Sequence, residues 1–324
     1  MNRLFIIGIG RSGSTLLSKT LGSHPDCLDN PEIPLFSFFY KALRNNRFNS
    51  ERNHLVVRFI NAMKRRHPGH PWQIQPEEIA QIPSELDYFS YMNQLSTLFT
   101  SDSMSEKNTQ GKQWIIDKNP VNTLHVHQFL KEYPQTKAIF LVRDPRANVA
   151  SRIQSVNSVH GRNDHWILNA IRWKRYNRHF HYLTRDYESQ IYLLRYEQFV
   201  THPQQTINEL CAFLGLSPMK IEEVATLNSN GHNEANTRLN KKYVDLNQPI
   251  NSRAIEQWRE VLTHRQQETI ESICRYEMHN LGYVSETHSS AYIPLTFQII
   301  AFWYELKEKI VFSLPLSLKL KRLE

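Results

Sequence analysis

Cysteine is scarce in this 324-residue chain, which has only three, at positions 27, 211 and 274. They form no CxxC motif and have no His/Cys spacing typical of metal ligands. This small, odd count argues against a disulfide framework and against a zinc site. It is typical of a protein from a reducing compartment. We therefore expect a cytoplasmic protein whose chemistry requires no metal.

Long apolar runs are also absent. The N-terminal stretch MNRLFIIGIG has too short an apolar part for a signal peptide, and it continues into a Gly/Ser turn rather than a cleavage site. Residues 289–304 carry no charge, but they are too few for a membrane-spanning helix and include Pro294. The tail 289–324 mixes apolar, aromatic and basic residues, so two interpretations stay open. It is a helix packed on the domain, or it makes a peripheral contact with a membrane surface.

Blocks of like charge are missing as well, although the net charge is +8. A basic balance favours anionic partners such as nucleotides, sulfate or phosphate esters, acidic lipids or nucleic acid. The basic residues are spread along the chain and no nucleic-acid-binding module is recognisable, so we expect no nucleic-acid partner. With 40% apolar and 22% charged residues, the composition is that of a globular protein.

Strand and helix patterns alternate along the chain. Four apolar segments have the composition of buried strands, and each runs into a helical pattern: 4–9, 114–117, 137–142 and 190–199. Three of the following helices are predicted over 14–22, 123–133 and 203–214, and a long helix is predicted over 164–184. This order predicts an α/β fold, a P-loop-like parallel sheet covered by helices on both faces. We expect one domain over 1–288, with a helical insertion at about 33–110.

The first predicted turn has the spacing of a phosphate-binding loop. Gly8, Gly13 and Thr15 fit the pattern G-x-x-x-x-G-K-[ST], but Ser14 stands at the lysine position. In nucleoside triphosphatases that lysine reaches the outer phosphates, so ordinary ATP or GTP hydrolysis is disfavoured. A plain glycine turn before a helix is the alternative interpretation.

An anion site at this turn does not depend on the lysine. Gly10 and Gly13 allow the backbone to turn tightly and to present its N–H groups, and the following helix adds the positive end of its dipole. Arg11 supplies a cation with a fork of donors. The expected loop donors are Ser12, Gly13, Ser14 and Thr15.

A second cluster follows the strand at 137–142. The stretch FLVRDPRANVAS places Arg143 at the end of this strand and Ser151 eight residues later, two helical turns on and back toward Arg143. An Arg–Ser pair at a strand end can bind a second phosphate. Alternatively, Arg143 only forms a local salt bridge with Asp144.

Together these motifs resemble a known family. GRSGSTLL (10–17), followed by LVRDPRANVASRI (141–153), is similar to the sulfotransferases that use 3′-phosphoadenosine 5′-phosphosulfate (PAPS). RSGSTLLSKTLGSHPD, followed by Glu32, resembles the start of the tyrosylprotein sulfotransferase branch and its bacterial relatives. IIDKNP (115–120), the segment 193–216 and QPINSRAIEQW (248–258) extend the resemblance. It implies that the first motif binds the 5′-phosphosulfate and the second binds the 3′-phosphate.

The resemblance also implies roles for single residues. Glu32 stands where the family has its catalytic base, while Arg11 and Lys118 are expected to stabilise the transferring group. The residues expected to contact PAPS are Arg11, Ser12, Gly13, Ser14, Thr15, Arg143, Ser151 and Tyr196. Other interpretations stay open: His24 as the base, Glu32 as a helix-start carboxylate, Lys118 as a solvated surface lysine and Tyr196 as a half-buried strand residue.

The chain departs from the tyrosylprotein branch in two places. KKY (241–243) replaces a catalytic serine, and the lysine expected near Gln257 is absent. Lys241, Lys242 and Arg253 are the candidates to replace these contacts. The chain also starts three residues before its first predicted strand, whereas the tyrosylprotein enzymes carry a membrane anchor there. We expect a cytosolic enzyme that sulfates a different hydroxyl or an amine.

These features predict a sulfotransferase that uses PAPS as cosubstrate and no metal. The acceptor is open among saccharides, lipids, small metabolites and peptides, and we expect it to bind at the insertion 33–110. The insertion's aromatic residues line the acceptor site or form core: Phe36, Phe38, Phe39, Tyr40, Tyr88, Phe89 and Tyr91. The alternatives to this function are a P-loop-type phosphotransferase and a non-catalytic protein that binds a nucleotide or a membrane surface.

Overall fold

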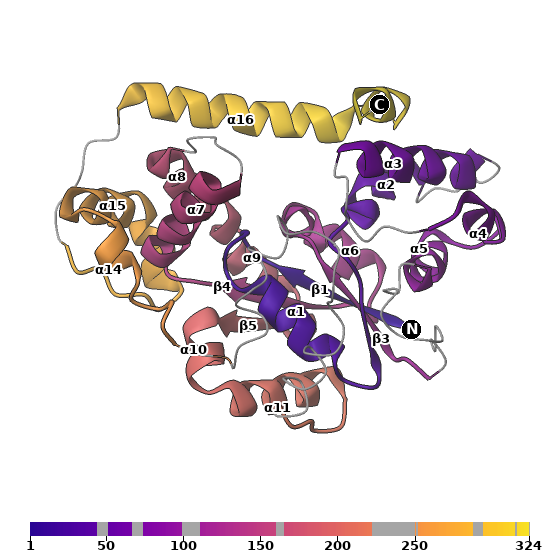
Figure 1. Ribbon diagram of the computed structural model, residues 1–324, viewed down its shortest axis with the longest axis horizontal. Coiled ribbons are helices and arrows are strands. Elements are labelled where there is room, and N and C mark those ends of the chain that lie inside the picture. The colour runs from indigo at the N-terminus through magenta and orange to yellow at the C-terminus, as the bar shows by residue number, and fades with distance from the viewer. Residues whose placement is uncertain are drawn as a thin grey trace.

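A computed structural model describes most of the chain: residues 1–43, 51–66, 74–98, 111–159, 165–221, 250, 252–287, 294–314 and 316–323. Its centre is a parallel sheet of five strands in the order β2-β3-β1-β4-β5 (Figure 1). The strands are β1 (Asn2–Ile7), β2 (Cys27–Asp29), β3 (Trp114–Lys118), β4 (Lys137–Val142) and β5 (Ile191–Arg195). This confirms the predicted α/β fold.

Helices cover the sheet on both sides (Figure 1). Those that follow the strands are α1 (Ser14–Gly22), α6 (Val126–Glu132), α7 (Pro145–Val159), α8 (Trp166–Asn177), α9 (Phe180–Asp186), α10 (Tyr196–Thr201), α11 (Pro203–Leu214), α14 (Trp258–Val261) and α15 (His264–Asn280). The insertion holds α2 (Leu35–Leu43), α3 (Arg52–Arg66), α4 (Pro76–Ala80) and α5 (Tyr88–Thr97), and the tail holds α16 (Leu295–Ser313) and α17 (Leu316–Leu323). The described residues also include the 3₁₀ turns η2 (Pro120–Leu124) and η3 (Glu188–Gln190).

The central strands are buried on both faces. In β1, Leu4 and Ile6 belong to one apolar cluster, and Phe5 and Ile7 belong to the other. None of these four side chains is more than 1% exposed. Successive residues of a strand point to opposite faces, so a strand covered on both sides reads as a continuous apolar run. This is why the sequence pattern located the central strands.

Several elements differ from the sequence predictions, including β1, which was predicted over 4–9 and spans Asn2–Ile7. The three-residue edge strand β2 was not predicted because it is too short to show a period. The strand expected over 190–199 ends at Arg195, where its pairing with β4 ends at Val142. The helix expected over 123–133 is replaced by η2 and α6. The helix expected over 164–184 divides after Asn177, whose side-chain amide donates to the Trp173 carbonyl and so competes with the backbone ladder.

The aromatic residues of the insertion form core. Phe36 lies at its centre, with ring centroids 4.7 to 5.2 Å from those of Phe5, Tyr88 and Phe129. Of the seven aromatic residues proposed to line an acceptor site, six are buried: Phe36, Phe39, Tyr40, Tyr88, Phe89 and Tyr91. Only Phe38 among them is partly exposed. These contacts favour the core interpretation.

The tail packs on the domain at two places. Phe297 of α16 lies 4.3 Å, centroid to centroid, from the ring of His165, next to α8. Leu316 and Leu320 of α17 are buried, and α17 contacts α3. α16 therefore runs across the top of the molecule from α8 to the insertion (Figure 1). None of the helices in the described part of the chain is long and apolar enough to cross a membrane.

The turn after β1 needs glycine at position 8, where φ is 126°. A Cβ atom there would lie 2.2 Å from the Leu141 carbonyl oxygen, a backbone atom that cannot move aside. Gly8→Ala is therefore expected to lower the free energy of unfolding by about 2–4 kcal/mol, measured by urea titration.

Gly215→Ala is the matched control for this substitution. Gly215 also has a positive φ, 72°, but a Cβ atom there would have nothing within 4 Å of it. This variant should lose only about 1 kcal/mol, the cost of the left-handed backbone. Equal losses for the two variants would contradict the clash at Gly8.

Candidate active site

The loop between β1 and α1 is held in an unusual backbone conformation. Arg11 has φ 73° and Gly13 has φ 91°, so both residues lie in the left-handed region. Such turns direct successive N–H groups to one side and form anion-binding concavities. Helix α1 starts directly afterwards, at Ser14, and adds its own N-terminal N–H groups. A Cβ atom on Gly13 would lie 2.5 Å from the Tyr196 ring, so only glycine fits there.

Side chains from two neighbouring elements brace this loop. The Asn148 amide of α7 donates to the Gly10 carbonyl and to the Ser12 hydroxyl, both at 3.1 Å. The Thr123 hydroxyl of η2 accepts from the Gly8 N–H at 2.8 Å. Because these contacts occupy the Gly10 carbonyl and the inward side of the loop, its conformation is set before a ligand arrives.

Arg143 and Ser151 both converge on Arg11. Arg143 donates through Nη1 to the Arg11 carbonyl at 3.1 Å, and its guanidinium lies 4.5 Å from the Tyr196 ring centroid. Its Nη2 donates to the Ala254 carbonyl at 2.6 Å. The Ser151 hydroxyl accepts from Arg11 Nε at 3.3 Å. Arg11 therefore lies between the other two residues, with Arg143 on its backbone carbonyl and Ser151 on its side chain.

The alternative salt bridge between Arg143 and Asp144 has no support. Asp144 instead binds Arg146, with its Oδ1 3.0 Å from Nε and its Oδ2 2.6 Å from Nη2. Arg146 also contacts Glu271 at 2.6 Å. This buried cluster ties α7 to α15 and leaves the Arg143 guanidinium directed toward the loop.

Lys118 and Glu32 form an ion pair beside the loop. Lys118 ends β3 opposite Ile6, two residues before Gly8. Its Nζ donates to Glu32 Oε2. The Lys118 side chain is only 7% exposed, while that of Glu32 is 43% exposed. The interpretation of Lys118 as a solvated surface lysine is therefore wrong. The buried Lys118 ammonium pairs with Glu32, whose side chain is partly exposed to solvent.

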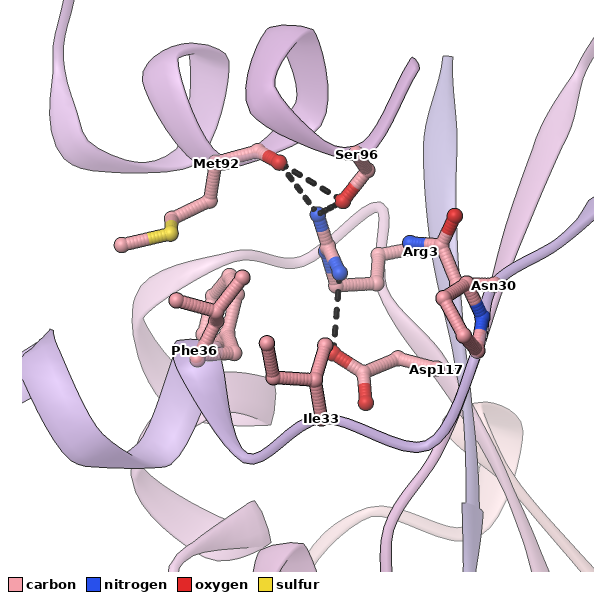
Figure 2. A pocket seen from close by; sticks show the side chains of 9 residues that line it. Arg3, Asn30, Ile33, Phe36, Met92, Ser96 and Asp117 are labelled. Carbon is pink, nitrogen blue, oxygen red and sulfur yellow. Dashed lines mark hydrogen bonds and ion pairs between the residues drawn. The ribbon is translucent and has the colours of Figure 1, made fainter. Parts of the chain in front are cut away.

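Asp117, the residue before Lys118, belongs to a buried network around Arg3 (Figure 2). Arg3 donates to Asp117 Oδ2, to the Met92 carbonyl and to Ser96 Oγ, each at 2.9 Å. Burial raises the pKa of Asp117, and the Arg3 charge opposes that shift. Asp117 also accepts from the Asn122 amide at 2.9 Å. The network thus ties β1, β3, η2 and α5 together directly before Lys118.

A small cavity adjoins the network. Asn30, Ile33 and Phe36 line it together with Arg3 and Asp117 (Figure 2). Asn30 and Ile33 belong to the segment that carries Glu32. The segment that carries Glu32 therefore lines the same cavity as Arg3 and Asp117.

His24 lies away from the loop, at the far end of α1. A helix of nine residues is about 13 Å long, and His24 follows its last residue by two positions. Its ring is buried, with Nδ1 accepting from the Asp26 N–H at 3.0 Å and Nε2 3.0 Å from the Ser217 carbonyl. This arrangement favours Glu32 over His24 as a base at the loop.

Sequence reasoning missed three residues of the site. Thr123 and Asn148 brace the loop, and Arg152 Nη1 lies 3.9 Å from the position of a Cβ on Gly10. Asn148, Ser151 and Arg152 have the i, i+3, i+4 spacing of one helix face. Once Ser151 is a candidate, this spacing predicts that Asn148 and Arg152 lie on the same side of the helix.

Some candidates lie outside the described residues. These are Lys241 and Lys242, within the segment 222–249. Arg253 is described and precedes Ala254, whose carbonyl contacts Arg143. Within the described ranges, no three His, Cys, Asp or Glu side chains are grouped so that they could hold a metal ion.

The arrangement is suited to transfer of an anionic group. Loop N–H groups, Arg11, Lys118 and Arg143 provide positive charge at the carboxyl ends of β1, β3 and β4, where ligands bind on parallel sheets. Glu32 adds one proton acceptor beside these positively charged groups. Fixed donors and cations of this kind stabilise charge that develops on a leaving group.

Comparison with known proteins identifies relatives. A family model described as "Sulfotransferase family" matches residues 3–220. Nodulation protein NoeE of Sinorhizobium fredii is 25% identical over 303 residues, covering 82% of this chain and 62% of NoeE. A protein-tyrosine sulfotransferase of Drosophila melanogaster is 25% identical over 221 residues, covering 66% of this chain and 38% of that protein. The chain thus matches less than two thirds of the length of either relative.

Solved structures show the same fold. The sulfotransferase domain of the olefin synthase from Synechococcus PCC 7002 has a TM-score of 0.56 at 20% identity, covering 87% of this chain and 95% of that domain. The sulfotransferase domain from the curacin biosynthetic pathway has a TM-score of 0.55 at 18% identity, covering 87% and 98%. The family model spans well over half of the chain and includes the loop, Glu32, Lys118 and Arg143. The chain belongs to the sulfotransferase family.

Proposed function

We propose that the protein transfers a sulfuryl group from 3′-phosphoadenosine 5′-phosphosulfate to a hydroxyl or amine acceptor. The observation that carries this proposal is the contact between Glu32 and Lys118 beside the loop that follows β1. It places a proton acceptor and a buried cation next to an anion-binding turn in a chain of the sulfotransferase family. Ser14 at the lysine position of the loop disfavours phosphoryl transfer.

The residues present fit a donor with two anionic ends. Loop N–H groups at Ser12, Gly13, Ser14 and Thr15 would hold the 5′-phosphosulfate, with Arg11 beside them. Arg143 would hold the 3′-phosphate. It is a buried guanidinium whose Nε has no hydrogen-bond partner among the described residues. Ser151 would add a hydroxyl, and Tyr196 packs against both Gly13 and Arg143.

The donor supplies an activated sulfuryl group, and the chain supplies charge and a base. In the proposed step the acceptor oxygen or nitrogen attacks sulfur, and the bond from sulfur to the bridging phosphate oxygen breaks. The acceptor proton passes to Glu32. Lys118 and Arg11 stabilise the negative charge that develops on the leaving nucleotide and on the transferring group.

We propose that the acceptor reaches Glu32 from its exposed side, next to the insertion. The 43% exposure of the Glu32 side chain leaves the carboxylate open to a solute. One relative is a protein-tyrosine sulfotransferase, which keeps peptide tyrosine among the candidates with saccharides, lipids and small metabolites. KKY at 241–243, in place of the serine of that branch, favours another acceptor.

We also propose a cytoplasmic location. Cys27, Cys211 and Cys274 are all buried and unbonded. Burial raises the pKa of the Cys27 thiol to about 12, which keeps it protonated and unreactive. Buried free thiols agree with a reducing compartment.

Titration calorimetry tests the donor site. We expect 3′-phosphoadenosine 5′-phosphate to bind at least about tenfold more tightly than ATP or 5′-AMP, because a charge-assisted contact contributes about 1.5–3 kcal/mol. Arg143→Ala should remove this preference, and Arg185→Ala, at an exposed site on α9, should keep it. Equal binding of the three nucleotides, or no binding, would contradict the donor assignment.

A further inference from the structure

The positive charge of the chain is concentrated in three helices. α2, α3 and α17 together contain nine of the 39 Lys and Arg residues and none of the 31 Asp and Glu residues. The rest of the chain therefore contains 30 basic and 31 acidic residues. The three helices thus carry a charge of +9 and the rest of the chain carries −1, which the sequence pattern does not show because these helices lie far apart along the chain.

The basic helices are neighbours in the fold. α17 contacts α3, and α2 lies directly beneath α3 (Figure 1). The side chains of Lys41, Arg65, Lys321 and Arg322 are exposed. α4, which carries Glu77 and Glu78, is separated from α17 by α3 in this view. The surface around α17 is therefore basic.

Next to this basic surface, α16 exposes one apolar face. Leu295, Ile299, Ile300, Phe302, Trp303 and Ile310 are 39% to 62% exposed. At 100° per residue they lie within an arc of about 160°, on one side of the helix. Phe297, which packs on His165, lies on the opposite side. The outer stripe is thus one continuous helix face rather than a set of scattered apolar residues.

We propose that α16 and α17 dock the protein on an anionic lipid bilayer. Apolar side chains along a helix, including Phe and Trp, insert at the boundary between headgroups and acyl chains. Basic side chains next to them attract acidic lipids. α17 continues from α16 and adds Leu318, 48% exposed, next to Lys321 and Arg322. This inference does not depend on the proposed sulfuryl transfer.

Charge decides between a bilayer and a second copy of the chain. A second copy of the chain has the same net charge of +8, so pairing through the α16 stripe would not neutralise the basic helices, and like net charges disfavour association. An anionic bilayer instead neutralises the basic helices while it covers the apolar stripe. The surface therefore fits acidic lipid better than a second copy.

Co-sedimentation of the full chain with vesicles tests the proposal. We expect binding to vesicles of phosphatidylcholine and phosphatidylglycerol, at least about tenfold weaker binding to phosphatidylcholine alone, and weaker binding at high salt. Phe302→Ser/Trp303→Ser and Lys321→Glu/Arg322→Glu should each reduce binding by about tenfold or more. All four residues are exposed, so the fold should persist, which a circular dichroism melt checks.

Matched controls come from other surfaces. Tyr182→Ser/Tyr276→Ser removes two aromatic residues that are 62% and 66% exposed, close to the 61% of Phe302 and Trp303. Arg265→Glu/Arg275→Glu reverses two exposed charges on α15. Both controls should bind like the wild type. Absence of binding to anionic vesicles, equal losses in the controls, or a solution dimer that Phe302→Ser/Trp303→Ser dissociates would overturn the proposal.

Discussion

Glu32→Gln should reduce sulfuryl transfer by about 10²–10⁴-fold, the usual contribution of a general base. The substitution keeps the size of the side chain and a hydrogen-bond acceptor for Lys118, but it removes the group that takes the acceptor proton. Binding of 3′-phosphoadenosine 5′-phosphate should change little, because Glu32 lies beside the loop and supplies none of its donors. A large loss in turnover with intact nucleotide binding would distinguish a base from a structural carboxylate.

The measurement uses ³⁵S-labelled donor with a panel of alcohols, phenols, saccharides and amines. Glu85→Gln is the matched control, since Glu85 is an exposed carboxylate of the adjacent insertion and contacts only its neighbour Ser84 in the described structure. It should transfer sulfate at the wild-type rate. Wild-type turnover in Glu32→Gln would remove Glu32 from the mechanism.

Arg3→Met is expected to lower the free energy of unfolding by about 3–5 kcal/mol, the usual cost of leaving one partner of a buried ion pair alone. Arg3 is 2% exposed and is the cation that holds Asp117. Its removal also takes away the donor that Arg3 supplies to Asn93 Oδ1 and to Ser96 Oγ. Arg3→Met/Asp117→Leu should recover part of the loss, because it removes the stranded carboxylate.

The loss in Arg3→Met should depend on pH. Burial already raises the pKa of Asp117, and removing Arg3 raises it further. The folded variant then holds a proton to higher pH than the unfolded chain, so its stability falls as the pH rises through the folded pKa. Urea titrations should show a larger difference from the wild type near neutral pH than at about pH 5. A loss independent of pH would contradict a stranded carboxylate.

Local patterns predicted the parts of the fold that depend on neighbouring residues. The bounds of α1 and α11 agree with the sequence prediction, and so do those of β4. α11 ends at Gly215, a left-handed cap that the sequence signals directly. Burial on both faces makes the central strands continuous apolar runs, which explains why β4 was clear.

Contacts between distant segments could not be predicted in the same way. The pairing of Arg3 with Asp117 joins residues 114 positions apart, and Lys118 contacts Glu32 across 86 positions. No period or motif encodes either pair. Tyr196 illustrates the same limit. It packs against Gly13 and Arg143 directly after β5, and β5 ends at Arg195, where its pairing with β4 ends. The family resemblance supplied Glu32 and Lys118 as candidates, whereas their contact required the fold.

A crystal structure of the protein with 3′-phosphoadenosine 5′-phosphate tests the donor site most directly. We expect the 5′-phosphate on the N–H groups of Ser12 to Thr15, beside Lys118, and the 3′-phosphate on Arg143. Glu32 should then lie on the open side of the 5′-phosphate. A nucleotide bound elsewhere, or one whose 3′-phosphate points away from Arg143, would contradict the assignment of this site as the sulfuryl donor site.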